Sequence, residues 1–317
     1  MYDELMPDVN HRFYPGLLAM LCFLFLACRL PAVAQNNNGY PARVNQNRLK
    51  TVMIAESAIA TIGLTGLNYL WYRKFPHSRF HLFNDSNEWM NMDKAGHATT
   101  AYSISSVQYD MMRWSGVPDR QAVWIGGLTA MAFQTIIEIF DGFSSKWGFS
   151  VTDMLANIAG TSLFMSQQLA FNGQRVQLKF SFHHSIFASY NPAELGRNRW
   201  QTWLKDYNGQ TYWLSVNPAS FMGANNSFPR WLNASFGYGA EGMTGGLRNP
   251  EVIQGVHLPA FRRYRQYYIS LDANFRGLEK SNTRPDLLLS LPAIIKLPFP
   301  AVEVSSPDLF KFHGLYF

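Results

Sequence analysis

The sequence predicts an α+β protein: an N-terminal bundle of about four helices followed by a β-rich C-terminal half. Apolar residues recur with helical spacing up to Phe171, and from Val176 onward they alternate with polar residues, as in half-buried strands. Aromatic and charged residues each make up 15% of the chain, whereas about 25% charged residues is usual for globular domains. This balance argues against disorder and suits a chain that touches a membrane.

Residues 1–34 are expected to form a signal peptide. The apolar run from Tyr14 to Ala27 has the length of a signal peptide's central region and is short for a membrane span. Ala34 ends a small-x-small cleavage site, so the mature chain would begin at Gln35, with a polar linker over residues 35–45. Acidic residues precede the apolar run, where positive charge is usual.

Both cysteines, Cys22 and Cys28, lie inside this leader. Cleavage after Ala34 leaves a mature chain without cysteine, which needs no disulfide in an oxidising compartment. The alternative is a lipoprotein with a lipidated Cys28, but the preceding Phe25 fits that signal poorly. We therefore expect simple cleavage and an exported, periplasmic, membrane-associated protein of the cell envelope. The sequence leaves inner and outer membrane open.

Residues 46–172 are expected to form a helical domain. Pro118-Asp119 is a helix start signal, and Ser150 is the predicted N-cap of the last helix, with Asp153 three residues later as in a capping box. The first and last helices are apolar enough to cross a membrane, the third is marginal and the second is interrupted by Asp110, so the bundle could be embedded in a membrane or lie against one. The predicted helices are Gln46–Lys74, Met92–Trp114, Arg120–Phe140 and Val151–Phe171.

Residues 173–317 are expected to form a β-rich region packed on the helices. From Arg175 to Phe182 apolar and polar residues alternate, which predicts a strand with one buried face. About five strands are too few for a closed membrane barrel, so we expect a small sheet or half-barrel. The other predicted strands are Thr211–Val216, Leu232–Tyr238, Gln266–Asn274 and Phe310–Phe317.

The net charge of +6 comes from basic residues scattered along the chain rather than from a basic arm. Since no nucleic-acid motif is present either, nucleic acid is not an expected partner. A membrane or an envelope lipid is, because positive charge is attracted to anionic head groups. The sequence contains no P-loop, dinucleotide fingerprint or nucleophile elbow, and no cofactor is expected.

Three short stretches of the helical region place ionisable residues among apolar neighbours. Within each stretch the polar residues are three or four positions apart and share a helix face. A charge on an apolar helix must find a partner or change its protonation. We therefore expect the stretches to meet, so that two basic side chains balance the acids. The stretches are Asp93-Lys94-Ala95-Gly96-His97, Glu138-Ile139-Phe140-Asp141 and Ser150 to Asn157.

Three interpretations of these stretches are open. They could form a hydrogen-bonded network that fixes helix register. They could bind a metal ion, although the Glu-x-x-His pairs of carboxylate-bridged sites are absent. They could act as a general acid and base on a lipid-linked or cell-wall substrate, with His97 paired to a carboxylate. The candidate catalytic residues are His97, Asp93, Glu138 and Asp153, and the candidate network residues are Lys94, Asp141, Ser150 and Asn157.

The ordered motifs Asp-Lys-x-x-His, Glu-x-x-Asp and Ser-x-x-Asp-x-x-x-Asn-x-x-Gly, within Glu88 to Phe164, resemble the YfiM family of predicted periplasmic lipoproteins and, more distantly, the VanZ-like membrane proteins. The segment Lys205 to Trp213 is similar to a longer, Bacteroidetes-type version. The resemblance implies an envelope location, and a cell-wall or lipid substrate only by analogy. Two features depart from it: Lys146-Trp147-Gly148 stand where VanZ-like sequences usually carry an arginine, and the leader has no convincing lipobox.

These features together predict an envelope protein with a structural or binding role, and an envelope enzyme is the alternative. An enzyme requires a cleft that opens onto the polar residues. A structural role expects the same residues to be sealed and fully hydrogen-bonded.

Overall fold

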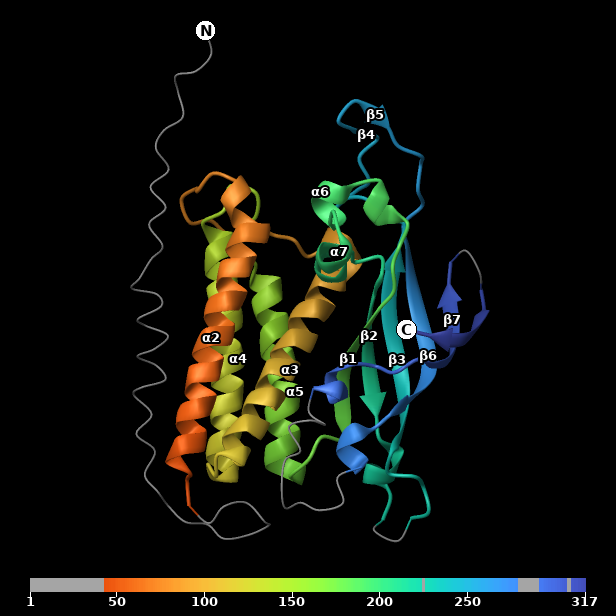
Figure 1. Cartoon of the computed structure of the whole chain (residues 1–317). Coiled ribbons are helices and arrows are strands. Elements are labelled where there is room, and N and C mark those ends of the chain that lie inside the picture. Colours follow the sequence, from red (N-terminus) through yellow and green to blue (C-terminus); the bar gives the residue numbers. More distant parts are fainter. Residues whose placement is uncertain (1–42, 224–225, 279–290, 307–308) are drawn as a thin grey trace.

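The computed structural model describes residues 43–223, 226–278, 291–306 and 309–317. The expected signal peptide, both cysteines and most of the expected linker lie outside the described residues. Within them the fold class is as predicted, because helices form the N-terminal half and an antiparallel sheet forms the C-terminal half (Figure 1).

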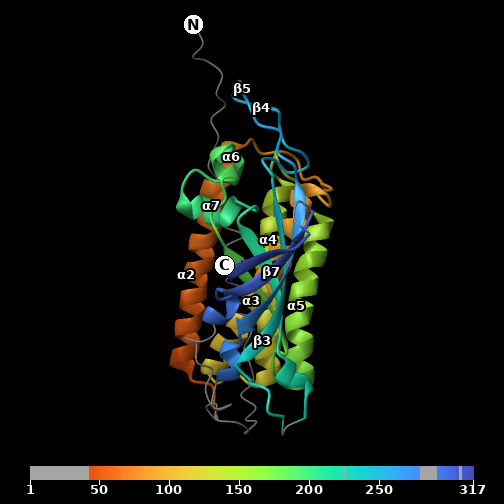
Figure 2. The same ribbon diagram turned by 90° about the vertical axis from the view of Figure 1, so that its right-hand side faces the viewer.

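Four long helices run alongside one another (Figures 1 and 2). Two of their N-caps follow from the sequence: the Asn45 side chain accepts hydrogen bonds from two amides of the first turn, and the Ser150 hydroxyl accepts one from the amide of Asp153. The helix α3 packs on the three other long helices, most extensively on α4 and α5, and on the first strands of the sheet. The helices are α2 (Gln46–Leu70), α3 (Met92–Trp114), α4 (Asp119–Gly142) and α5 (Val151–Phe171).

Two glycines let α3 approach its neighbours closely. A Cβ atom at Gly160 of α5 would lie 2.0 Å from the carbonyl oxygen of Ala98, and one at Gly126 of α4 would lie 2.5 Å from that of Ser105. Both obstacles are backbone atoms of α3, which cannot rotate away as a side chain can. The helix spacing therefore depends on the absence of a side chain at these positions.

Replacing Gly160 with alanine is expected to lower the free energy of unfolding by roughly 3 kcal/mol, because the added methyl group forces α3 and α5 apart. The measurement is denaturant unfolding of the purified chain. Gly66→Ala in α2 is the matched control, since a Cβ there meets nothing within 4 Å. That change should leave stability unchanged or raise it by up to ~1 kcal/mol. Equal effects of the two substitutions would contradict the close packing.

The C-terminal half contains one six-stranded antiparallel sheet in the order β1-β2-β3-β6-β7-β8. Its strands are β1 (Val176–Phe182), β2 (Gln210–Val216), β3 (Leu232–Glu241), β6 (Tyr264–Ala273), β7 (Phe299–Ser305) and β8 (Lys311–Tyr316). A separate hairpin consists of β4 (Val252–Ile253) and β5 (Val256–His257). The short helices are α6 (Pro192–Leu195), α7 (Arg199–Lys205) and single 3-10 turns at Tyr72–Lys74, Glu88–Asn91, Phe187–Ser189, Pro218–Phe221, Phe275–Leu278 and Pro292–Ile294.

The six-stranded sheet is curled. An isolated parallel bridge joins Phe180 of β1 to Ile295, and the amide of Lys296 donates to the Phe180 carbonyl at 2.9 Å. The hydroxyl oxygens of Thr211 in β2 and Tyr316 in β8 lie 3.0 Å apart. In a flat sheet β2 and β8 would be four strand spacings, or about 19 Å, apart, which is farther than these two side chains can reach. The sheet must therefore bend until β8 approaches β2, which gives the shape of a half-barrel.

The buried face of the sheet combines many polar side chains with an aromatic cluster of Trp213, Tyr268 and Tyr316, and its outer face is apolar. In β6, Gln266, Ser270 and Asp272 are buried, whereas Ile269 and Leu271 between them are exposed. The outer face is covered next to β1, where Leu178 packs against the core of the helical bundle. Farther along the sheet the outer apolar side chains are open.

Candidate functional site

The polar residues singled out from the sequence meet at one end of the helical bundle. Because consecutive helices run in opposite directions, the first turns of α3 and α5 and the last turns of α4 lie at the same end, near α6 and α7 (Figure 1). Six charged or titratable side chains gather there, and we call them the ionic cluster. They are Asp85, Asp93, Lys94, His97, Glu138 and Asp153.

Lys94 is the centre of the ionic cluster. Its Nζ atom lies 2.7 Å from Asp85 Oδ2, 2.9 Å from Asp93 Oδ2 and 2.8 Å from Asp153 Oδ1, and only 14% of its side chain is exposed. Burial lowers the pKa of Lys94, but the charges of Asp93 and Asp153 and the hydrogen bonds to Asp153 and Asp85 outweigh burial and raise it above its usual range. The lysine therefore stays protonated and neutralises part of the acidic charge.

Asp85 ties the loop before α3 to the start of α5. Its Oδ1 atom accepts hydrogen bonds from Ser150 Oγ at 2.7 Å and from Thr152 Oγ1 at 2.8 Å. Burial raises the pKa of Asp85, but hydrogen bonds from Asp153, Lys94 and the two hydroxyls outweigh burial and hold it below its usual range. Sequence reasoning missed Asp85 and Thr152, because a polar residue in a loop, or one beside an N-cap, usually faces solvent.

His97 is oriented by an amide. Its Nδ1 atom lies 3.1 Å from Asn157 Oδ1, which also accepts from Gln134 Nε2 at 2.9 Å. Since the amide oxygen is an acceptor, Nδ1 carries the proton that it donates. The other ring nitrogen, Nε2, faces three carboxylate oxygens: Glu138 Oε1 at 3.7 Å, Asp93 Oδ1 at 3.8 Å and Asp153 Oδ2 at 4.0 Å.

These distances are too long for hydrogen bonds, so His97 bonds directly to Asn157 and not to a carboxylate. Burial lowers the pKa of His97, but the charges of Asp93, Asp153 and Glu138 outweigh burial and raise it. Burial is also the main reason why the pKa of Asp153 rises to about 8, and the charge of Asp93 adds to it. The cluster therefore holds protons that isolated carboxylates would release.

Glu138 is buried with one oxygen unpaired. Its Oε2 atom accepts a hydrogen bond from the Ser150 amide at 3.0 Å, whereas Oε1 has no hydrogen-bond partner among the described residues. The residue is 1% exposed. A lone oxygen in such a position is costly unless a proton or a cation lies beside it.

Two residues differ from what the sequence suggested. Asp141 lies outside the ionic cluster, and its Oδ1 atom accepts a hydrogen bond from Tyr72 at 2.9 Å. The hydroxyl of Tyr207, which lies between α7 and β2, donates to Asp93 Oδ1 at 2.9 Å and so links the cluster to the sheet side. Sequence reasoning missed Tyr207, because its contact with Asp93 spans 114 positions.

The chain enters α3 through a left-handed turn. Trp89, Met90 and Asn91 have φ angles of 47°, 53° and 68°, a region that non-glycine residues seldom adopt. The turn is held by a hydrogen bond from the Trp89 amide to the Gly246 carbonyl at 3.0 Å and by one from Tyr238 to the Met90 carbonyl. Backbone strain of this kind persists where the surroundings fix it, and here the turn leads directly into the first turn of α3, which carries Asp93.

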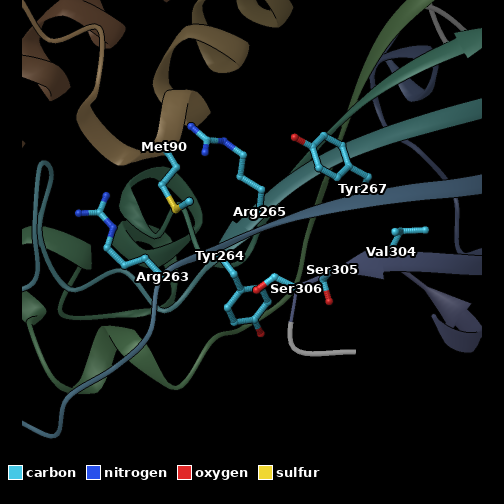
Figure 3. Close-up of a pocket in the computed structure, with 8 residues that line it drawn as sticks. All are labelled: Met90, Arg263, Tyr264, Arg265, Tyr267, Val304, Ser305 and Ser306. Carbon is cyan, nitrogen blue, oxygen red and sulfur yellow. The ribbon is translucent and has the colours of Figure 1, made fainter. Parts of the chain in front are cut away.

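A surface pocket lies beside this turn (Figure 3). None of its lining residues belongs to the ionic cluster, so this pocket gives no access to His97. The lining residues are Met90, Arg263, Tyr264, Arg265, Tyr267, Val304, Ser305 and Ser306.

Residues 81–167 match the family DUF2279, which is described as "Predicted periplasmic lipoprotein". The matched stretch is about a quarter of the chain, and it contains the whole ionic cluster. No curated protein and no solved structure matches the chain. The match confirms the exported, envelope-associated location predicted from the sequence. Since Cys28 lies outside the matched residues, the choice between cleavage and lipidation stays a prediction.

Proposed function

We propose that this chain is a structural component of an envelope membrane, with its apolar outer faces in contact with lipid. The proposal rests on one observation: polar and apolar side chains are distributed in the opposite way to that of a water-soluble protein. Among the described residues, buried polar and charged side chains outnumber buried apolar ones, while large apolar side chains are exposed on most long elements. Water-soluble monomers rarely expose apolar patches of this extent.

The helical side supplies the first lipid-facing surface. Two helices, α2 and α4, are long and apolar enough to cross a membrane by length and composition. Only 11% of the most apolar stretch of α2 is buried, and Ile54 and Ile62 are 71% and 72% exposed. The end of α2 is aromatic and basic: Arg73 lies over the ring of Tyr69, and Lys205 lies over that of Trp71. Such residues favour the boundary between lipid and water.

The sheet supplies the second lipid-facing surface. Phe236, Ile269 and Val302 occupy neighbouring strands and point to the open side, and each is more than a third exposed. The polar residues of the same strands point to the buried side. Strands that face lipid show this arrangement, with polar residues inside and apolar residues outside.

The ionic cluster suits a brace better than a catalytic site. Lys94 bonds three carboxylates that come from a loop, α3 and α5, and Tyr207 adds the sheet side. His97 favours the enzyme alternative, because its Nε2 atom is free to take a proton and lies near three acids. Against that alternative stands the burial of the site, since 17% of the His97 side chain and 1% of the Glu138 side chain are exposed. The order of the three polar motifs along the chain also supports a relationship to the YfiM family and, more distantly, to the VanZ-like proteins.

The proposal is tested by removing every possible lipid anchor. In the full chain with Cys22→Ser and Cys28→Ser, the protein should stay with the membrane fraction after washing with alkaline carbonate, because its own apolar faces hold it there. Wild type is the control. Release of the variant, with retention of wild type, would show that a lipid on Cys28 is the only attachment and would overturn the proposal.

A further inference from the structure

In two carboxylates of the ionic cluster, one oxygen faces the Lys94 ammonium group and the other faces His97 Nε2. Asp93 gives Oδ2 to Lys94 and turns Oδ1 toward His97 Nε2, and Asp153 gives Oδ1 to Lys94 and turns Oδ2 toward the same nitrogen. Glu138 also turns its unpaired Oε1 atom toward His97 Nε2. One nitrogen and three carboxylate oxygens from three helices therefore face one another without a direct hydrogen bond between the nitrogen and any of the oxygens.

The charges of the cluster do not balance. Four carboxylates, those of Asp85, Asp93, Glu138 and Asp153, face one lysine and one histidine. Even with His97 protonated, two negative charges remain uncompensated if all four acids are ionised. Uncompensated charge in a largely buried site is costly, so either protons or a cation must supply the difference.

We propose that His97 Nε2, Asp93 Oδ1, Asp153 Oδ2 and Glu138 Oε1 bind a divalent first-row metal ion of the zinc or manganese type. This site is independent of the contact with lipid proposed above. The candidate ligand atoms of Asp93, His97 and Asp153 all lie within 4.8 Å of one another. Tetrahedral zinc ligands of this kind lie about 3.4 Å apart, so the observed separations of 3.7 to 4.0 Å from Nε2 are longer than in a formed site, and the carboxylates must draw together when the ion binds.

The surroundings of these atoms are those of a metal site. A ligating histidine normally donates its other N–H to a carbonyl or carboxylate oxygen, and His97 Nδ1 donates to Asn157, which Gln134 fixes. Each ligating carboxylate is held as well: Lys94 holds those of Asp93 and Asp153, and the Ser150 amide holds that of Glu138. A cation here replaces the protons that the cluster otherwise keeps.

The test is direct metal binding by the full chain in detergent. After treatment with a chelator and its removal, the protein is equilibrated with Zn²⁺ or with Mn²⁺, and bound metal is measured by mass spectrometry. We expect one ion per chain for wild type and at least about a tenfold weaker binding for His97→Ala and for Asp93→Asn. Asp93→Asn is included as the variant that should keep its fold, because the amide has the shape of the carboxylate and can still accept the hydrogen bond from Tyr207.

His313→Ala is the matched control. His313 also pairs with a carboxylate, that of Glu303 at 2.8 Å, but it lies in the sheet, outside the ionic cluster. This variant should bind one ion, as wild type does. Failure of folded wild type to take up either metal would overturn the proposal, and so would undiminished binding by a folded Asp93→Asn variant. Retention of the chain in the membrane in those cases would leave the proposed contact with lipid intact.

Discussion

Lys94→Met is expected to lower the free energy of unfolding by about 3–5 kcal/mol. The substitution leaves three carboxylates, those of Asp85, Asp93 and Asp153, close together without the ammonium group that lies within 2.9 Å of each. Methionine fills a similar volume, so the loss reflects charge rather than a cavity. Denaturant unfolding in detergent at neutral pH measures the effect.

Lys146→Met is the matched control for Lys94→Met. Lys146 pairs with Glu194, but the two side chains are 28% and 34% exposed, and ion pairs at the surface contribute less than about 1 kcal/mol. A loss from Lys94→Met as small as that from Lys146→Met would contradict the role of Lys94 as the centre of a brace.

Lys179→Met is expected to have an effect of similar size in the sheet. Lys179 Nζ of β1 lies 2.7 Å from Asp272 Oδ2 of β6, and neither side chain is exposed. Without the lysine, Asp272 keeps a hydrogen bond from Ser215 at 2.7 Å, but no other described residue forms an ion pair with it. Removal of one partner of a buried ion pair costs about 3–5 kcal/mol. The measurement is again denaturant unfolding.

The double variant Lys179→Met with Asp272→Leu separates charge from packing. Replacement of both members of a buried pair by apolar residues is often close to neutral, so the double variant should recover most of the stability lost in Lys179→Met. A double variant that is as unstable as Lys179→Met alone would show that the loss came from packing or from the hydrogen bond to the Ala273 carbonyl.

Local patterns in the sequence were sufficient for most of the fold. The bounds of α3 and α5 match their prediction, because each helix has its own periodicity and the second also has the Ser150 cap. The strand β7 was missed. Its Pro300 disfavours a central strand, and the chain accommodates the proline at a register shift against β8. The curl of the sheet was only a general expectation, since it depends on long-range contacts such as that between Thr211 and Tyr316.

For the candidate site, the sequence indicated the helical residues but not the loop residues. The spacing of Asp93 and His97, and of Ser150 and Asp153, is visible because helix geometry fixes it. Asp85 carries no such pattern, although it bonds Lys94 and two hydroxyls. The expected pairing of His97 with a carboxylate is not a direct hydrogen bond: Nδ1 donates to Asn157 of α5, and Nε2 lies 3.7 Å or more from the acids.

The most direct test of the central claim is aqueous labelling of single cysteines in membranes. With Cys22 and Cys28 replaced by serine, cysteines are placed at Ile62 of α2 and at Ile269 of β6, which are 72% and 58% exposed, and at the exposed polar position Arg197 as the control. If the apolar faces lie against lipid, a membrane-impermeant maleimide should label position 197 in opened membranes and leave positions 62 and 269 unlabelled until detergent is added. Labelling of all three positions at the same rate without detergent would contradict the claim.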